Sequence, residues 1–297
     1  MDSLIRPYRI DDFASDISKG YDVILSFIPP AVSGYLAEDI RKKFCKNARL
    51  VQFWTDPLSM GRCNGIEDIP RTRKLHVIIE RTLLSYADKI VFCYPLLCDM
   101  EKELHPQYSE RMFWSDVGYT EHRHTPTSKN DNKPITIGLF GSYQSKVRNI
   151  RPFLEAIQSF NDIRFVLRGD SDISIDASAY PNLDYLSGRR PVDEIENEEA
   201  NCDILICLGG KSGITHPAGK VFYYANYNKP IVYIGDGEHN DFFKKYLSSF
   251  DRYIICDNEV ESIRVAIQKA VDSLPQFVLT IPERLEPRII AQSIVAE

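Results

Sequence analysis

The sequence lacks the features that mark several large classes of protein. No apolar stretch approaches the length of a membrane-spanning helix, and residues 1–6 contain no long apolar segment of the signal-peptide type. Acidic residues outnumber basic ones by 42 to 36, for a formal charge of −6. A broad basic surface for nucleic acid is therefore not expected. We predict a cytoplasmic protein that does not bind nucleic acid and that contacts membranes only peripherally, at their inner face.

Recognisable catalytic and metal-binding motifs are also absent. The seven cysteines include no pair with the spacing of a zinc or redox motif, and several, such as Cys93 and Cys207, lie inside apolar runs. Such thiols are typical of buried side chains in a reducing compartment. The sequence has no Ser-His-Asp order, HExxH, Walker loop or GxGxxG fingerprint. Hydrolase chemistry, ATP, NAD and a metal site are therefore not predicted.

What the sequence does contain is a regular alternation of short apolar runs and amphipathic segments, which is typical of βαβ units and a parallel sheet. We expect an α/β protein with strands at 21–27, 50–54, 89–93, 112–115, 135–140, 163–167, 183–186, 203–208, 230–234 and 252–256. Helices are expected at 32–44, 71–86, 96–105, 150–160, 192–200, 220–226, 239–247, 260–271 and 284–295.

A polar segment divides this pattern into two similar halves. Residues 121–134 carry almost no large apolar side chain and are typical of an interdomain linker. We therefore predict an N-terminal domain at 1–120 and a C-terminal domain at 135–275. The remaining residues, 276–297, would form a tail and a helix that packs back on the first domain.

Two strand-to-helix turns of the second half have the chemistry of phosphate sites. In the first, a strand ends at Gly141 and leads through Ser142 toward Lys146 and Arg148. In such a turn backbone N–H groups can approach an anion, and either basic side chain can add positive charge. An ordinary connecting turn would have the same pattern.

The second turn follows the apolar run 203–208 and contains Gly209, Gly210 and Gly213. Glycines let a ligand approach the backbone closely, and a helix is expected to start near Pro217, a residue suited to a first helical turn. His216, Gly219 and Lys220 would lie at the positive end of this helix. We interpret the segment as a diphosphate cradle; the alternative is a surface loop.

Three further positions have both a functional and a structural interpretation. Gly169 follows a strand and would border a ligand or simply form a tight turn. Asp56 follows the strand at 50–54 and would be a catalytic base or acceptor-binding group, or cap a turn before Pro57. Glu80 and Arg81, on the next helix, are expected to form an exposed pair.

Several segments, in this order, resemble the GT-B glycosyltransferases, and family 4-like members in particular. The resemblance covers about residues 21–271. The segments are Glu80-Arg81 with Tyr86-Ala87-Asp88-Lys89-Ile90-Val91, Leu183 to Gly188, Ala200 to Ile204, and Pro217 to Ala225 with Lys229-Pro230-Ile231-Val232.

The resemblance implies two Rossmann-like domains facing across a cleft. The second would hold a nucleotide-sugar donor and the first a glycan or lipid-linked acceptor of surface polysaccharide synthesis. It also implies metal-independent catalysis that retains anomeric configuration, without a cofactor. Lys146, Lys220 and Asp56 are the predicted catalytic residues. The predicted donor-binding residues are Gly141, Ser142, Arg148, Gly169, His216, Pro217, Gly219 and Tyr223.

The sequence departs from this family at three places. Tyr223 stands where an acidic residue usually binds the donor ribose, and Ser142 stands where an arginine commonly follows the glycine. The usual opening strand and glycine-rich loop are not evident before Tyr21, so the first lobe is either abbreviated or diverged. A non-catalytic, glycosyltransferase-like binding subunit and a sugar-nucleotide epimerase remain as alternatives, and the apolar helix faces suit a monomer or a homodimer equally.

Overall fold

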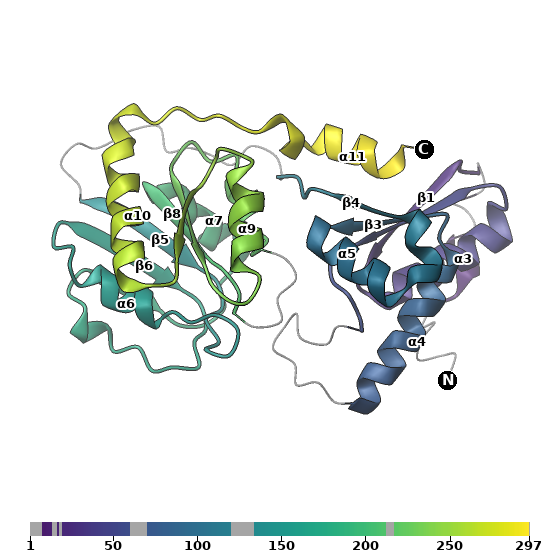
Figure 1. Ribbon diagram of the computed structural model, residues 1–297, viewed down its shortest axis with the longest axis horizontal. Helices are drawn as coiled ribbons and strands as arrows, with labels where there is room; N and C mark the ends of the chain where they lie inside the picture. The colour runs from purple at the N-terminus through teal and green to yellow at the C-terminus, as the bar shows by residue number, and fades with distance from the viewer. Residues whose placement is uncertain are drawn as a thin grey trace. The chain divides into compact units, whose positions relative to one another are not determined.

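The computed structural model describes residues 8–13, 17, 20–59, 70–119, 134–211 and 217–296 (Figure 1). The chain forms two compact units. Unit 1 comprises Met1–Val117 and Pro287–Glu297, and unit 2 comprises Gly118–Glu286. The predicted linker, with its two histidines, lies almost wholly outside the described residues, apart from Pro134.

Unit 1 contains a four-stranded parallel sheet in the order β1-β2-β3-β4. Its two central strands are almost entirely buried, which explains their continuous apolar sequence. The strands are β1 (Val23–Ile28), β2 (Arg49–Trp54), β3 (Lys89–Cys93) and β4 (Met112–Ser115), and the helices are α3 (Ala31–Phe44), α4 (Pro70–Tyr86), α5 (Pro95–Leu104) and α11 (Pro287–Val295), with 3₁₀ turns η1 (Ile10–Phe13) and η2 (Pro106–Arg111).

The last helix belongs to unit 1 although it is last in the sequence. Helix α11 contacts β2 and β4 (Figure 1). The ammonium of Lys89 donates hydrogen bonds to the carbonyls of Ser293 at 2.9 Å and Ala296 at 2.8 Å. These contacts place a cation at the helix C-terminus, where it satisfies carbonyls that have no partner inside the helix.

Unit 2 contains a six-stranded parallel sheet in the order β10-β9-β8-β5-β6-β7. From β5 the chain proceeds outward through β6 and β7, then returns to the other side of β5 with β8. The elements are β5 (Ile135–Phe140), α6 (Arg151–Ile157), β6 (Ile163–Arg168), η3 (Ala177–Ala179), β7 (Leu183–Leu186), α7 (Val192–Asn201), β8 (Ile204–Leu208), α8 (Lys220–Tyr224), β9 (Ile231–Gly235), α9 (Asn240–Ser248), β10 (Ile254–Asp257), α10 (Val260–Ser273), η4 (Leu274–Gln276) and η5 (Glu283–Leu285).

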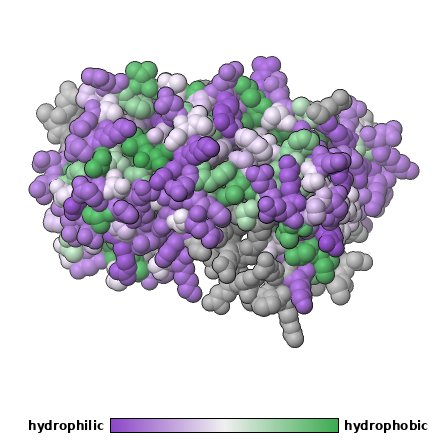
Figure 2. Space-filling view, in the orientation of Figure 1, coloured by the Kyte–Doolittle hydropathy of each residue, from purple (hydrophilic) through white to green (hydrophobic). Residues whose placement is uncertain are grey.

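The core of unit 2 lies where α6 and α10 pack together against the sheet. Phe153 and Phe165 meet edge to face with ring centroids 6.0 Å apart, and Ile263, Ile267 and Ala270 line the buried face of α10. On the face drawn in Figure 2, hydrophilic residues predominate and hydrophobic ones form small separate groups, the usual arrangement for a surface in contact with water.

The prediction of an α/β protein with parallel sheets is confirmed, as is the existence of each predicted strand and helix. Three helices are shorter than predicted. Helix α6 ends at Ile157, α8 ends at Tyr224, and α11 begins at Pro287. The six described cysteines are buried free thiols. No helix among the described residues is long and apolar enough to cross a membrane.

Candidate functional site

A pocket of about 300 Å³ lies at the carboxyl edge of the unit 2 sheet, beyond the ends of β5, β6 and β7. The chain continues from β5 to β6 on one side and from its neighbour β8 to β9 on the other. This edge is therefore the topological switch point at which sheets of this kind bind ligands. The lining residues are Phe140, Gly141, Ser142, Arg168, Gly169, Asp170, Gly188, Arg189, Arg190, Ile195 and Lys220.

A larger hollow of about 990 Å³ opens at the opposite, amino-terminal edge of the same sheet. Its lining includes Ile163 and Leu183, the first residues of β6 and β7. Position in the fold outweighs volume here, because ligands of open parallel sheets bind beyond the carboxyl ends of the strands. We therefore take the smaller pocket as the candidate site.

Glycines bring the strand ends close together in this pocket. Gly169 has a φ of +133°, and a Cβ added to it would lie 1.6 Å from the carbonyl oxygen of Gly141. Gly141 has a φ of +146°, and its N–H donates to the Arg168 carbonyl at 3.0 Å. Gly188, with a φ of +97°, lines the same pocket. The backbone is therefore open to a ligand at Gly141 and Gly188, whereas the lack of a side chain at Gly169 lets the ends of β5 and β6 approach each other.

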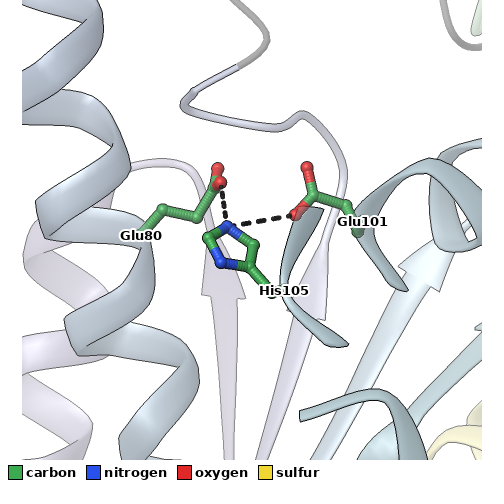
Figure 3. A group of neighbouring side chains, drawn as sticks. All are labelled: Glu80, Glu101 and His105. Atoms are coloured by element: carbon green, nitrogen blue, oxygen red, sulfur yellow. Dashed lines mark hydrogen bonds and ion pairs between the residues drawn. The ribbon is translucent and has the colours of Figure 1, made fainter. Parts of the chain in front are cut away.

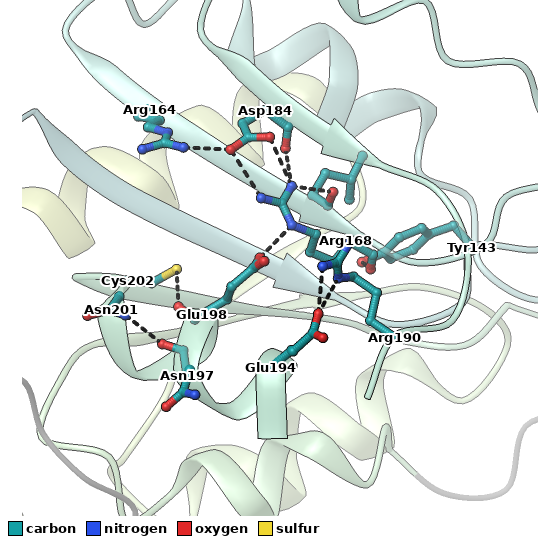
Figure 4. A network of polar contacts seen from close by, with 11 residues as sticks. Tyr143, Arg164, Arg168, Asp184, Arg190, Glu194, Asn197, Glu198, Asn201 and Cys202 are labelled. Carbon is teal, nitrogen blue, oxygen red and sulfur yellow. Dashed lines mark hydrogen bonds and ion pairs between the residues drawn. The ribbon is translucent and has the colours of Figure 1, made fainter. Parts of the chain in front are cut away.

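The side chain of Arg168 ties β6 to β7 and α7 (Figure 4). Its Nε donates to Glu198 at 2.5 Å, its Nη2 to Asp184 Oδ2 at 3.1 Å, and its Nη1 to the Asp184 carbonyl at 2.7 Å. Burial alone would lower the pKa of Arg168, but the two carboxylates outweigh burial and raise it. Because its charge is compensated, Arg168 holds the pocket wall in place rather than offering a free cation to a ligand.

Three other cations reach the pocket, and they differ in how they are held. Arg190 pairs with Glu194 at 2.6 Å, one helical turn along the chain (Figure 4). Lys220 pairs with the buried carboxylate of Glu199. Among the described residues, exposed Arg189 has neither a hydrogen-bond nor an ion-pair partner. Arg189 is therefore the pocket cation with the smallest cost of turning toward an anion.

A buried polar cluster fixes the position of Lys220. Glu199 is 1% exposed and accepts hydrogen bonds from the Tyr224 hydroxyl at 2.7 Å and the Tyr227 hydroxyl at 3.4 Å. The Lys220 ammonium also lies 5.6 Å from the centre of the Phe140 ring, at the end of β5. Burial, together with Glu199, raises the pKa of Tyr224, which keeps the hydroxyl a donor. The head of Lys220 is thus placed between the end of β5 and helix α7.

Comparison with known proteins gives a fold but no sequence family. No family model matches the sequence, and no curated protein matches it. Solved structures do match. Anabaena Alr3699/HepE in complex with UDP-glucose is 12% identical over 96% of this chain and 80% of that one, with a TM-score of 0.56. TarM is 10% identical over 96% of this chain and 55% of that one (TM-score 0.58), and a glycosyltransferase from Rickettsia africae ESF-5 is 14% identical over 96% of this chain and 75% of that one (TM-score 0.52).

The chain has the GT-B glycosyltransferase fold. At this level of identity the likeness extends to architecture alone. Four of the residues predicted from sequence line the pocket of this GT-B chain: Gly141, Ser142, Gly169 and Lys220. The functional roles assigned to them stay predictions.

Lys146 and Arg148 do not line the pocket, although Lys146 was predicted to be catalytic and Arg148 to bind the donor. The connection after β5 is ten residues long, because α6 begins only at Arg151. Buried Tyr143 anchors this connection. Its N–H donates to the Asp170 carbonyl at 2.7 Å, and its hydroxyl donates to the Arg168 carbonyl at 3.1 Å. Lys146 is exposed. Arg148 is half-buried near Tyr143 and has a pKa lowered by burial.

Of the second predicted turn, the structure describes residues 209–211 and those from Pro217 onward, and His216 lies outside the described residues. Helix α8 begins at Lys220, three residues later than Pro217, and has five residues. Pro217 is buried, while Gly219 is the exposed N-cap and leaves open space where a Cβ would stand. Tyr223 is 39% exposed, whereas its helical neighbours Phe222 and Tyr224 are fully buried.

In unit 1, Asp56 follows β2, is half-buried, and accepts a hydrogen bond from the Thr55 hydroxyl at 3.2 Å. The prediction of an exposed Glu80–Arg81 pair is wrong, because Glu80 is fully buried and only Arg81 is exposed. The buried face of α4 carries Glu80 inward, where it meets backbone N–H groups and His105.

Sequence reasoning missed Arg189, Arg190 and Glu199. The first two carried a usable signal, since two consecutive arginines follow Gly188 just beyond a predicted strand. Glu199 had no such signal in the sequence, because it lies in a run of acidic residues on a predicted helix, a pattern typical of a solvent-exposed face. Its burial depends on tyrosines about 25 residues further along the chain.

Proposed function

We propose that this chain is a glycosyltransferase that uses a nucleotide-sugar donor, and that the donor diphosphate binds in the unit 2 pocket. The observation that carries this proposal is the convergence of Arg189, Arg190 and Lys220 with the open backbones of two glycines, Gly141 and Gly188, at the switch point of a GT-B sheet. Anions bind where backbone N–H groups and cationic side chains meet.

The proposed chemistry follows from the leaving group. As the bond between sugar and diphosphate breaks, negative charge grows on the phosphate oxygens, and cations fixed nearby stabilise it. Lys220 is held for this task by Glu199, and Arg189 is free to turn toward the anion. These side chains supply the positive charge, so we propose that transfer needs no metal ion.

The structure of HepE with UDP-glucose makes a uridine nucleotide sugar the first donor to test. The finer parts of the proposal rest on the sequence resemblance. They are a glycan or lipid-linked acceptor of surface polysaccharide synthesis, transfer of a hexose with retention, and a role for Asp56 on the acceptor side. A cytoplasmic location with peripheral membrane contact belongs to the same proposal.

The test is calorimetric and thermal-shift titration with UDP-, GDP-, CMP- and dTDP-sugars, without added metal. We expect saturable binding of one nucleotide class. Arg189→Ala should weaken it about 10-fold or more, because a hydrogen bond to a charged group contributes about 1.5–3 kcal/mol. Arg81→Ala is the matched control, since Arg81 is exposed in unit 1 and should leave binding unchanged. Folded protein that binds none of these donors would refute the proposal.

One observation favours a second candidate, a non-catalytic donor-binding subunit. Tyr223 is an exposed tyrosine where the resembling family carries an acidic residue. The two candidates are separated by turnover: an enzyme releases the free nucleoside diphosphate when an acceptor glycan is supplied. Tight donor binding without nucleotide release, across a panel of acceptors, would favour the binding subunit.

A further inference from the structure

Unit 1 holds a cluster of three ionisable side chains that the proposed reaction does not use. Glu80 lies on α4, Glu101 on α5, and His105 directly after α5 (Figure 3). Each is fully buried. One oxygen of each carboxylate and the Nε2 of His105 all lie within 4.8 Å of one another.

The two glutamates have very different surroundings. Glu80 Oε2 accepts hydrogen bonds from the N–H groups of Leu58 at 2.7 Å and Ser59 at 3.0 Å. Its Oε1 accepts one from the Ser59 hydroxyl at 2.5 Å and lies 2.9 Å from His105 Nε2. The Glu80 carboxylate is therefore buried, and both of its oxygens are hydrogen-bonded to protein groups.

Glu101, in contrast, has no hydrogen-bond partner on either oxygen among the described residues. Its Oε2 points toward the same His105 Nε2, at 3.9 Å (Figure 3). Burial and the neighbouring Glu80 raise the pKa of Glu101 to about 9. A protonated Glu101 would leave its O–H without an acceptor, and a bare carboxylate would leave a buried charge uncompensated. Each state is unfavourable in the interior of a protein.

We propose that Glu80, Glu101 and His105 bind one Zn²⁺ ion, which joins α4 to α5. The donor set of one imidazole and two carboxylates is of the kind that zinc takes in proteins. Tetrahedral ligands about 2.1 Å from a zinc ion are about 3.4 Å apart. The distances from His105 Nε2 to Glu80 Oε1 (2.9 Å) and Glu101 Oε2 (3.9 Å) lie on either side of this value.

The charges also balance. A divalent ion compensates the charge of both carboxylates at once, and His105 coordinates it through Nε2. Its three protein ligands are wholly buried, which favours a structural role, with a ligand such as a water molecule at the fourth tetrahedral position. All three ligands belong to unit 1, whereas the donor pocket residues belong to unit 2, and the proposed metal-independent transfer does not depend on the ion.

The experiment uses the full chain without a polyhistidine tag. After treatment with a chelator, the protein is titrated with Zn²⁺ and followed by calorimetry, elemental analysis and thermal unfolding. We expect one zinc ion per chain and a rise in Tm, since an ion that binds only the folded state stabilises that state. Co²⁺ should give visible absorption bands from the same site.

The variant Glu101→Gln keeps the shape of the side chain and removes its charge, and should weaken zinc binding at least about 100-fold, more than loss of an outer-shell contact. Glu103→Gln is the matched control, because Glu103 is exposed on the same helix. Absence of stoichiometric zinc in the wild type, or unchanged affinity in Glu101→Gln, would overturn the proposal. If Glu101→Gln does not fold, the wild-type titration decides alone. None of these measurements involves a sugar nucleotide, so failure of the donor proposal leaves them unaffected.

Discussion

Replacing Gly169 with alanine is expected to destabilise unit 2 strongly, because two separate costs add at this position. The first is backbone strain: a φ of +133° is rare for a residue with a Cβ and costs about 1–3 kcal/mol. The second is a collision, since the new Cβ would lie 1.6 Å from the oxygen of Gly141 and 2.7 Å from its carbonyl carbon. Both atoms are backbone, so the ends of β5 and β6 must separate.

Overpacking of this kind costs a further 1–3 kcal/mol or so, for a total of about 2–6 kcal/mol. Two other glycines separate the terms. Gly188→Ala has the strain of a φ of +97° but nothing within 4 Å of its Cβ, so it should cost only about 1–3 kcal/mol. Gly219→Ala has a φ of −55° and open space, and should be neutral or stabilise by up to about 1 kcal/mol.

The measurement is urea unfolding of each variant, monitored by far-UV circular dichroism, and the midpoints are compared at unchanged m-value. The expected order of stability is Gly219→Ala, then Gly188→Ala, then Gly169→Ala. Equal midpoints for the last two variants would show that the close approach of Gly169 to Gly141 does not constrain the strand ends. Gly141 and Gly169 both line the pocket, so Gly169→Ala, which separates them, should also reduce nucleotide binding.

Three further substitutions test the packing around the two sites. Tyr224→Phe removes a hydrogen bond to buried Glu199 and should cost about 1–2 kcal/mol in the free energy of unfolding; no change would mean that Glu199 is satisfied without it. Arg168→Met removes the ion-pair partner of Glu198 and leaves Asp184 paired with Arg164 alone, and should cost about 1–3 kcal/mol, the upper value being limited by the partial exposure of the two carboxylates; a rise in urea midpoint would contradict the network of Figure 4. Leu83→Ala empties a fully buried site in unit 1 and should cost about 2–5 kcal/mol, measured by urea unfolding.

The strands were predictable because their sequence reports burial directly. Strands 89–93, 112–115, 135–140 and 183–186 have the predicted bounds, and most are apolar runs bounded by polar residues. The bounds of the short helices were less predictable. Helix α8 begins at Lys220, where the predicted range 220–226 begins, but it ends two residues early at Tyr224, and no glycine or proline directly follows to mark this end.

The site residues were predictable where they directly follow a strand or begin a helix, as Gly141, Ser142, Gly169 and Lys220 do, and not where a longer connection intervenes. Gly141 and Gly169 follow from their positions at strand ends. Lys146 and Arg148 were expected to reach the ligand because they follow Gly141, but buried Tyr143 determines the path of the intervening chain. The depth of Glu80 likewise depends on His105, a partner 25 residues away that periodicity cannot identify.

The assignment of α11 to unit 1 has a consequence for biosynthesis. The chain leaves unit 1 at Val117 and supplies its last helix only from Pro287, after every residue of unit 2. On the ribosome, where domains fold in order of synthesis, the sheet of unit 1 therefore waits for its final helix until unit 2 has been made. During this interval the ammonium of Lys89 has no helix end to cap, and the surface of β2 and β4 that α11 contacts stays open to solvent and to chaperones.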